Sequence, residues 1–242
     1  TLESNAFANV NVEGCLYLNY SNVVVIQSGA FKSAVFKNDV DLSHNKIATI
    51  ESGAFLSASW NGNLNLSHNS IVLIEGFAFD SAVMVSLQLS HNNLTSLAPA
   101  AFTSGTYFEI DLSHNHLAHI PGGIVEWSPT NGSLIAGSPF YNTSMISLNL
   151  ADNKLTALHA DTFTGLNINV FVNFTKNNIS VLENGWFDAF PLEITLLMSN
   201  NPSQCSPGVL ANTLRTFTCT CVNNSQANVL GNGAYCSRAP CQ

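Results

Sequence analysis

The stretch DLSHNKIATIESGAF at residues 41–55 contains most of a unit that recurs along the chain. Its tetrapeptide LSHN stands at 42–45, 66–69, 89–92 and 112–115. With its Asn as the origin of a register, Ser21 is the first origin, and seven asparagines follow: Asn45, Asn69, Asn92, Asn115, Asn153, Asn177 and Asn201. Successive origins are 24, 24, 23, 23, 38, 24 and 24 residues apart. A fixed period of about 20–50 residues indicates a repeat architecture, so we expect a solenoid.

Five apolar columns accompany the asparagines. Positions five and three before the origin are apolar, as in Leu64 and Leu66, and so are positions two and five after it, as in Ile71 and Ile74. Ten positions after the origin the chain has a phenylalanine in most units: Phe31, Phe55, Phe79, Phe102, Phe163 and Phe187. The long unit has Val125 there instead, so we expect that coil to lack the aromatic ring.

The physical interpretation follows from this spacing. The two apolar residues of L-x-L alternate, so a short strand directs both into a core. The asparagine then turns the chain, and its side chain can bond backbone groups of its own turn and of the neighbouring coil. Because one coil cannot bury its own apolar face, stacked coils share a continuous core. The pattern predicts adjacent parallel strands about 4.8 Å apart.

The pattern LxLxxNxLxxLxxxxF resembles the 24-residue leucine-rich repeat of extracellular proteins, over roughly residues 1–201. The resemblance implies a horseshoe-shaped solenoid with a parallel β-sheet on the concave side. Irregular loops and turns are expected on the convex side, with little helix. Members of this family usually bind partners on the concave face.

The predicted domains are a repeat array over 1–201 and a disulfide-rich C-terminal cap over 202–242. Residues 2–7, LESNAF, align with IESGAF at 50–55, so the array is expected to start in the middle of a repeat. Upstream residues, another domain or another copy of the chain would then cover the first strand, and head-to-tail copies would form a filament or a ring. The 38-residue interval predicts an inserted surface loop near 126–143.

Composition and sequons favour export. The formal net charge is −8, which argues against nucleic acid or an anionic membrane as partner, and no apolar run reaches the about 18 residues of a membrane span. N-glycosylation sequons occur at Asn19, Asn65, Asn93, Asn131, Asn142, Asn173, Asn178 and Asn223. Together with the clustered cysteines, they predict an extracellular protein, either secreted or at the cell surface.

Five of the six cysteines lie after residue 204: Cys205, Cys219, Cys221, Cys236 and Cys241. Asn201-Pro202 followed by Cys205 resembles the start of the family's C-terminal cap. The family's C-x-C follows Asn-Pro directly, whereas here it stands at Cys219–Cys221, so the pairing stays open. We expect Cys15 to be a buried free thiol; a bond outside its own repeat is the alternative.

Residues with the potential for chemistry are few. His44, His68, His91 and His114 share one column, which suggests either a metal or pH-responsive ladder or a position that only flanks the turn. His114, His116 and His119 are weak candidates for a metal site, and no catalytic or cofactor-binding motif is present. The outward strand positions, where Tyr17 and Phe171 are the aromatics, are otherwise polar: Asp39, Asp41, Asn63, Asn65, Ser86, Gln88, Glu109, Asp111, Ser147, Asn149 and Asn173.

These patterns predict a non-catalytic glycoprotein without a cofactor, acting in adhesion or in self-assembly as a surface or matrix component. The alternative is a receptor ectodomain that binds its ligand on the concave face. A polar face with sequons at Asn65 and Asn173 favours the first hypothesis, because glycans would cover the surface that a receptor uses. The partner is expected to be a protein, including further copies of this chain, or a glycan.

The cap is predicted to contain at least two disulfides. Removing each should cost about 2–5 kcal/mol, because the reduced chain is less constrained when unfolded. Peptide mapping under non-reducing conditions should detect the bonds. If Cys219, Cys221, Cys236 and Cys241 were all free, the extracellular assignment would be wrong.

Overall fold

The computed structural model describes residues 1–124, 126–127, 134–183, 185–186, 188–191, 194–202, 217–220 and 226–229; for 126–127, 134–136, 217–220 and 226–229 only the backbone is described. Four of the five C-terminal cysteines lie outside these residues, and Cys219 is described by its backbone alone. The sequons at Asn131 and Asn223, as well as Val125 and Phe187, also lie outside the described part.

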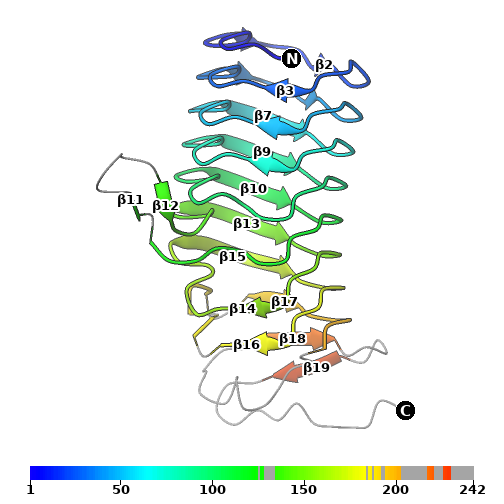
Figure 1. Cartoon of the computed structure of the whole chain (residues 1–242), viewed down its shortest axis with the longest axis vertical. Helices are drawn as coiled ribbons and strands as arrows, with labels where there is room; N and C mark the ends of the chain where they lie inside the picture. Colours follow the sequence, from blue (N-terminus) through cyan, green and yellow to red (C-terminus); the bar gives the residue numbers. More distant parts are fainter. Residues whose placement is uncertain are drawn as a thin grey trace.

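The chain forms a parallel β-solenoid, and the described residues contain no helix. Figure 1 shows the coils stacked one above another along the long axis. The largest sheet has ten strands, all paired in parallel. They are β1 (Asn11–Val12), β2 (Leu16–Tyr17), β4 (Val35–Phe36), β5 (Val40–Asp41), β7 (Ser59–Asn65), β9 (Val83–Gln88), β10 (Thr106–Asp111), β13 (Thr143–Asn149), β15 (Leu166–Asn173) and β17 (Thr195–Leu197). We call this the main sheet, and its side away from the core the outer face.

Short strands follow the turns and form smaller sheets. Three pair in parallel: β3 (Val25–Ile26), β6 (Thr49–Ile50) and β8 (Leu73–Ile74). A second parallel pair is β14 (Ala157–Leu158) with β16 (Val181–Leu182). Two antiparallel pairs are β11 (Glu126–Trp127) with β12 (Leu134–Ala136), and β18 (Phe217–Thr220) with β19 (Gln226–Val229).

The predicted register of the main sheet is confirmed. Its strands align the column that is five residues before each asparagine: Val40, Leu64, Leu87, Ile110, Leu148, Val172 and Leu196. Leu2 pairs with Ile26, one period before Ile50, as the alignment of 2–7 requires. The described part contains no helix long and apolar enough to cross a membrane. The horseshoe curvature stays a prediction.

The core contains a sixth column that the repeat pattern did not reveal. β7 begins at Ser59, upstream of the L-x-L segment, and this extension buries a large side chain in each coil: Phe36, Trp60, Met84, Tyr107, Met145 and Ile168. In the pairing of β7 with β9, Trp60 lies opposite Met84 and Asn63 lies opposite Ser86. Two residues separate Trp60 from Asn63 but only one separates Met84 from Ser86, so the register shifts by one residue at this point. The difference between 24-residue and 23-residue coils is therefore located at this kink in the strand.

The phenylalanine column forms a stack through the core. The rings of Phe7, Phe31, Phe55, Phe79, Phe102 and Phe140 follow one another with centroids 5.0, 5.0, 4.7, 5.4 and 5.4 Å apart. The expectation that the long coil lacks a ring is wrong, because Phe140 stacks on Phe102.

Counted backwards from Asn153, Phe140 has the same offset of 13 residues as Phe102 has from Asn115. The amide of Ser138 donates to the carbonyl of Gly123 (2.9 Å), so the coil is closed on both sides of the insertion. Residues 138–143, placed in the inserted loop by the sequence analysis, therefore belong to the coil.

Each asparagine of the repeat bridges two coils. The Nδ2 of Asn92 donates to the carbonyl of Leu66 in the previous coil (3.0 Å) and to that of Leu89 in its own (3.0 Å). Its Oδ1 accepts from the amide of Ile71 in the previous coil (3.0 Å). Asn92 is 4% exposed, so water cannot replace these bonds.

Asn92→Ala is expected to lower the free energy of unfolding by about 1–3 kcal/mol, because buried backbone groups lose their partner. Asn93→Ala is the matched control, since its side chain is exposed. Thermal or denaturant unfolding of protein made without N-glycans would measure both. Equal losses in the two variants would contradict this role of the asparagine column.

Candidate binding face of the main sheet

Five of the eleven polar residues assigned to the outer face cap the ends of their own strands. Four positions before the asparagine origin, a side-chain oxygen accepts a hydrogen bond from the backbone amide two residues later. Asp41 does so from Ser43 (2.9 Å) and Asp111 from Ser113 (3.0 Å). The same bond is made by Asn65, Asn149 and Asn173. These residues cap the strand ends, which explains their recurrence without any ligand.

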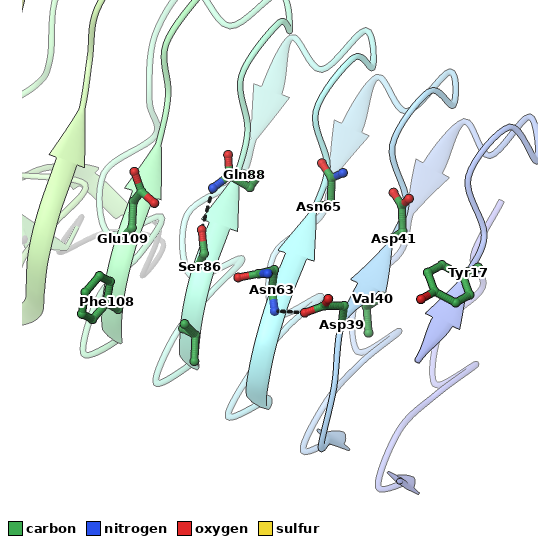
Figure 2. A pocket seen from close by; sticks show the side chains of 11 residues that line it. Tyr17, Asp39, Val40, Asp41, Asn63, Asn65, Ser86, Gln88, Phe108 and Glu109 are labelled. Carbon is green, nitrogen blue, oxygen red and sulfur yellow. Dashed lines mark hydrogen bonds between the residues drawn. The ribbon is translucent and has the colours of Figure 1, made fainter. Parts of the chain in front are cut away.

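A second outward column lies two residues before the capping residues. Its side chains do not cap their own strands. Asp39 and Asn63 are exposed, and Oδ1 of Asp39 accepts from the backbone amide of Asn63 (2.7 Å). Ser86 was expected to be outward but is only 7% exposed, and its Oγ accepts from Nε2 of Gln88 (2.6 Å). These bonds are drawn in Figure 2.

Two hollows adjoin on this face. The first, shown in Figure 2, has a volume of about 510 Å³ and extends from Tyr17 to Glu109. The second measures about 580 Å³ and extends from Trp60 to Asn169. Val85 and Phe108 line both, so the two hollows meet at these residues.

Phe108 is the largest departure from the predicted face. Its side chain is 57% exposed, whereas the outward positions were expected to carry aromatics only at Tyr17 and Phe171. Strict alternation with outward Glu109 would direct Phe108 inward. The kink instead leaves Tyr107 and Ile110 buried while both residues between them face outward.

Phe108 belongs to an apolar row on four neighbouring strands. Val85 and Val170 are 43% and 51% exposed, and Ile146 is part-buried. The strands β9, β10, β13 and β15 pair in this order. The row crosses a face that is otherwise rich in Asp, Asn and Ser, and aromatic residues so placed are typical anchors of protein interfaces.

Glu109 follows Phe108 directly and is part-buried. Burial and, to a smaller extent, the carboxylate of Asp111 raise the pKa of Glu109. No cationic side chain of the described residues forms an ion pair with it, and neither hollow is lined by Lys or Arg. A part-buried acid in this state would be stabilised by a cation that arrives from outside.

The weak metal candidates do not converge. His114 Nδ1 lies 3.2 Å from Oδ2 of Asp152, and His116 Nδ1 contacts the carbonyl of Asn115 (2.9 Å). No group of three or more His, Cys, Asp or Glu residues in the described part is arranged to hold a metal.

Cys15 was expected to be buried, and this is wrong: it is a free, exposed thiol. Leu16 is the inward residue of its strand, so its neighbour alternates to the outer face. A hydrogen bond with the thiol raises the pKa of Tyr17, which lies on the same face.

The described sequon asparagines are all accessible. Asn93, Asn142 and Asn178 are exposed, while Asn19, Asn65 and Asn173 are part-buried. Asn65 lines the first hollow, so a glycan there would occupy it.

No protein-family model matches the chain. No curated protein matches it either.

Glu109→Gln is expected to raise the melting temperature near pH 7. Because the pKa of Glu109 is raised on folding, its contribution to stability is present below the unfolded value of about 4.5 and is lost as pH rises through the folded value. The gain should therefore shrink as the pH falls to about 4.5 and below. Glu3→Gln, at an exposed site, is the control. If the melting temperatures of the two variants changed equally with pH, the raised pKa of Glu109 would be contradicted.

Proposed function

We propose that the chain is a non-catalytic, extracellular interaction protein of the leucine-rich-repeat type, which binds a protein segment on the outer face of its main sheet. The polar face that favoured adhesion or self-assembly in the sequence analysis is interrupted by the exposed row at Phe108. Binding of a ligand on the outer face is therefore favoured over adhesion or self-assembly.

The repeat type is supported by three features that recur along the array. An L-x-L strand directs both leucines inward, as Leu64 and Leu66 do. An asparagine then bonds the backbone of its own turn and of the previous coil. A stacked phenylalanine closes the far side of the core. Extracellular location is supported by the accessibility of the described sequons.

The observation that carries the proposal is the exposed side chain of Phe108 next to part-buried Glu109, whose carboxylate forms no ion pair with any described residue. The first hollow adds the carboxylates of Asp39 and Asp41. Such a surface complements a segment with one aromatic or aliphatic side chain and nearby Lys or Arg. The apolar contact would supply affinity, and the acidic surroundings would select against acidic partners.

A library of random peptides displayed on phage would test this chemistry. Peptides selected on the native protein should combine an apolar side chain with Lys or Arg. Phe108→Ser or Glu109→Lys should each weaken their binding by about tenfold or more, as loss of an interface anchor does. Val72→Ser, an equally exposed apolar position outside both hollows, should leave it unchanged. Binding that is insensitive to both test variants, or selection of acidic peptides, would contradict the proposal.

A map of glycan occupancy on native protein distinguishes the two functions. If the outer face is the binding surface, Asn65 should be unmodified in the mature protein, while exposed Asn93, Asn142 and Asn178 are occupied. Full occupancy at Asn65 and Asn173 would favour the adhesive or self-assembling function instead. No mass shift with glycosidase at any site would count against export.

A further inference from the structure

Five aromatic rings form a continuous column along the turns that follow the main sheet. Tyr20, His44, His68, His91 and His114 stack in this order with centroids 4.7, 4.6, 4.4 and 4.3 Å apart. Their planes are within 3–7° of parallel. All five side chains lie on the surface. Coil stacking explains the spacing, because adjacent parallel strands are about 4.8 Å apart and hold equivalent residues in register.

The turn itself does not require imidazole. Each ring residue has a positive φ of 53–55°, and its amide bonds the next coil, as His68 does to the carbonyl of Ser90 (3.1 Å). Asp152, Lys176 and Asn200 occupy the same position in later coils with φ of 53–59°. The backbone therefore accepts several polar side chains here, and the run of four histidines needs another explanation.

The charged surroundings of the column are uneven. At one end, Oδ2 of Asp152 lies 3.2 Å from Nδ1 of His114 and 3.8 Å from Nζ of Lys176. Asp41 and Asp111 stand three residues before His44 and His114, and Lys46 and His116 stand two residues after them. His68 and His91 have no acid at these positions: Asn65 and Gln88 precede them, and Ser70 and Asn93 follow. Among the described residues, the titratable groups that act on His68 in the middle of the column are therefore His91 and His44.

We propose that the histidine column is a proton-sensitive element that stabilises the four consecutive coils when its rings are neutral and destabilises them when adjacent rings are charged. Parallel rings at this spacing cannot direct two nitrogens at one metal ion at the about 2.0–2.1 Å that zinc requires, so the stack as formed favours protons over a chelated metal. Two positive charges on neighbouring rings would repel each other at contact distance.

The shift in the pKa of His68 agrees with a column that is stable when neutral. Its pKa is lowered, first by burial and then by His91 and His44. A histidine whose pKa falls on folding contributes stability that is fully present above the unfolded value of about 6.5 and is lost as pH falls through the folded value. The predicted loss of stability therefore begins below about pH 6.5.

Thermal unfolding between about pH 7.5 and 5 is the test, with a chelator present to remove metal ions. The variant with His44, His68, His91 and His114 all changed to Asn keeps a residue that tolerates positive φ. The melting temperature of the native sequence should fall across this range by about 2–4 °C more than that of the variant. His119→Asn, an exposed histidine outside the column, should behave like the native sequence. The His159–Glu183 pair is present in all these proteins, so its titration cancels in the comparison.

Two further measurements make the proposal falsifiable if the quadruple variant folds poorly. His68→Lys places a permanent charge where Lys176 shows that lysine is tolerated, and it should lower the melting temperature at pH 7.5 more than His68→Asn, which only removes the ring from the stack. By NMR, the pKa of His68 should rise when His44 and His91 are changed to Asn. Parallel pH profiles for native and quadruple variant, or equal effects of His68→Lys and His68→Asn, would overturn the proposal.

Discussion

One amide side chain per coil holds this molecule in register. Asn115 donates from Nδ2 to the carbonyls of Leu89 and Leu112, and its Oδ1 accepts from the amide of Leu94. These bonds tie each turn to the previous one at a buried position where no water can take over. The strand pairing, the phenylalanine stack and the histidine column all depend on that alignment, because each places equivalent residues of successive coils side by side.

The sequence predicted the parts of the fold that repeat in residue type. Five columns around the asparagine gave the inward residues and the strand register, and the structure confirms both. It did not reveal the column of Phe36, Trp60 and Met84, because the residue type changes and its distance from the asparagine varies by one. Phe140 was missed because the count ran forward through the insertion; counting back from Asn153 would have found it.

The candidate site was less predictable because coils of 24 and 23 residues differ by one residue within the strand. The kink that absorbs the one-residue difference between coils breaks the alternation on which inward and outward positions were assigned. Phe108 and Glu109 are therefore both outward, which a strict period of two cannot predict. Conversely, Asp41 and Asp111 were assigned to a partner-binding surface, but each caps its own strand. An aspartate that accepts such a short-range hydrogen bond cannot be told from one that binds a partner by its residue type alone.

The closure of the long coil has a practical consequence. The chain leaves the coil at Gly123 and returns at Ser138, whose amide donates a hydrogen bond to the carbonyl of Gly123. On the next layer, the amides of Ala100 and Phe102 donate to the carbonyls of Ser138 and Pro139 as if nothing intervened. The insertion is thus a site for loop replacement, where a foreign peptide could be displayed without a change in the coils of the solenoid.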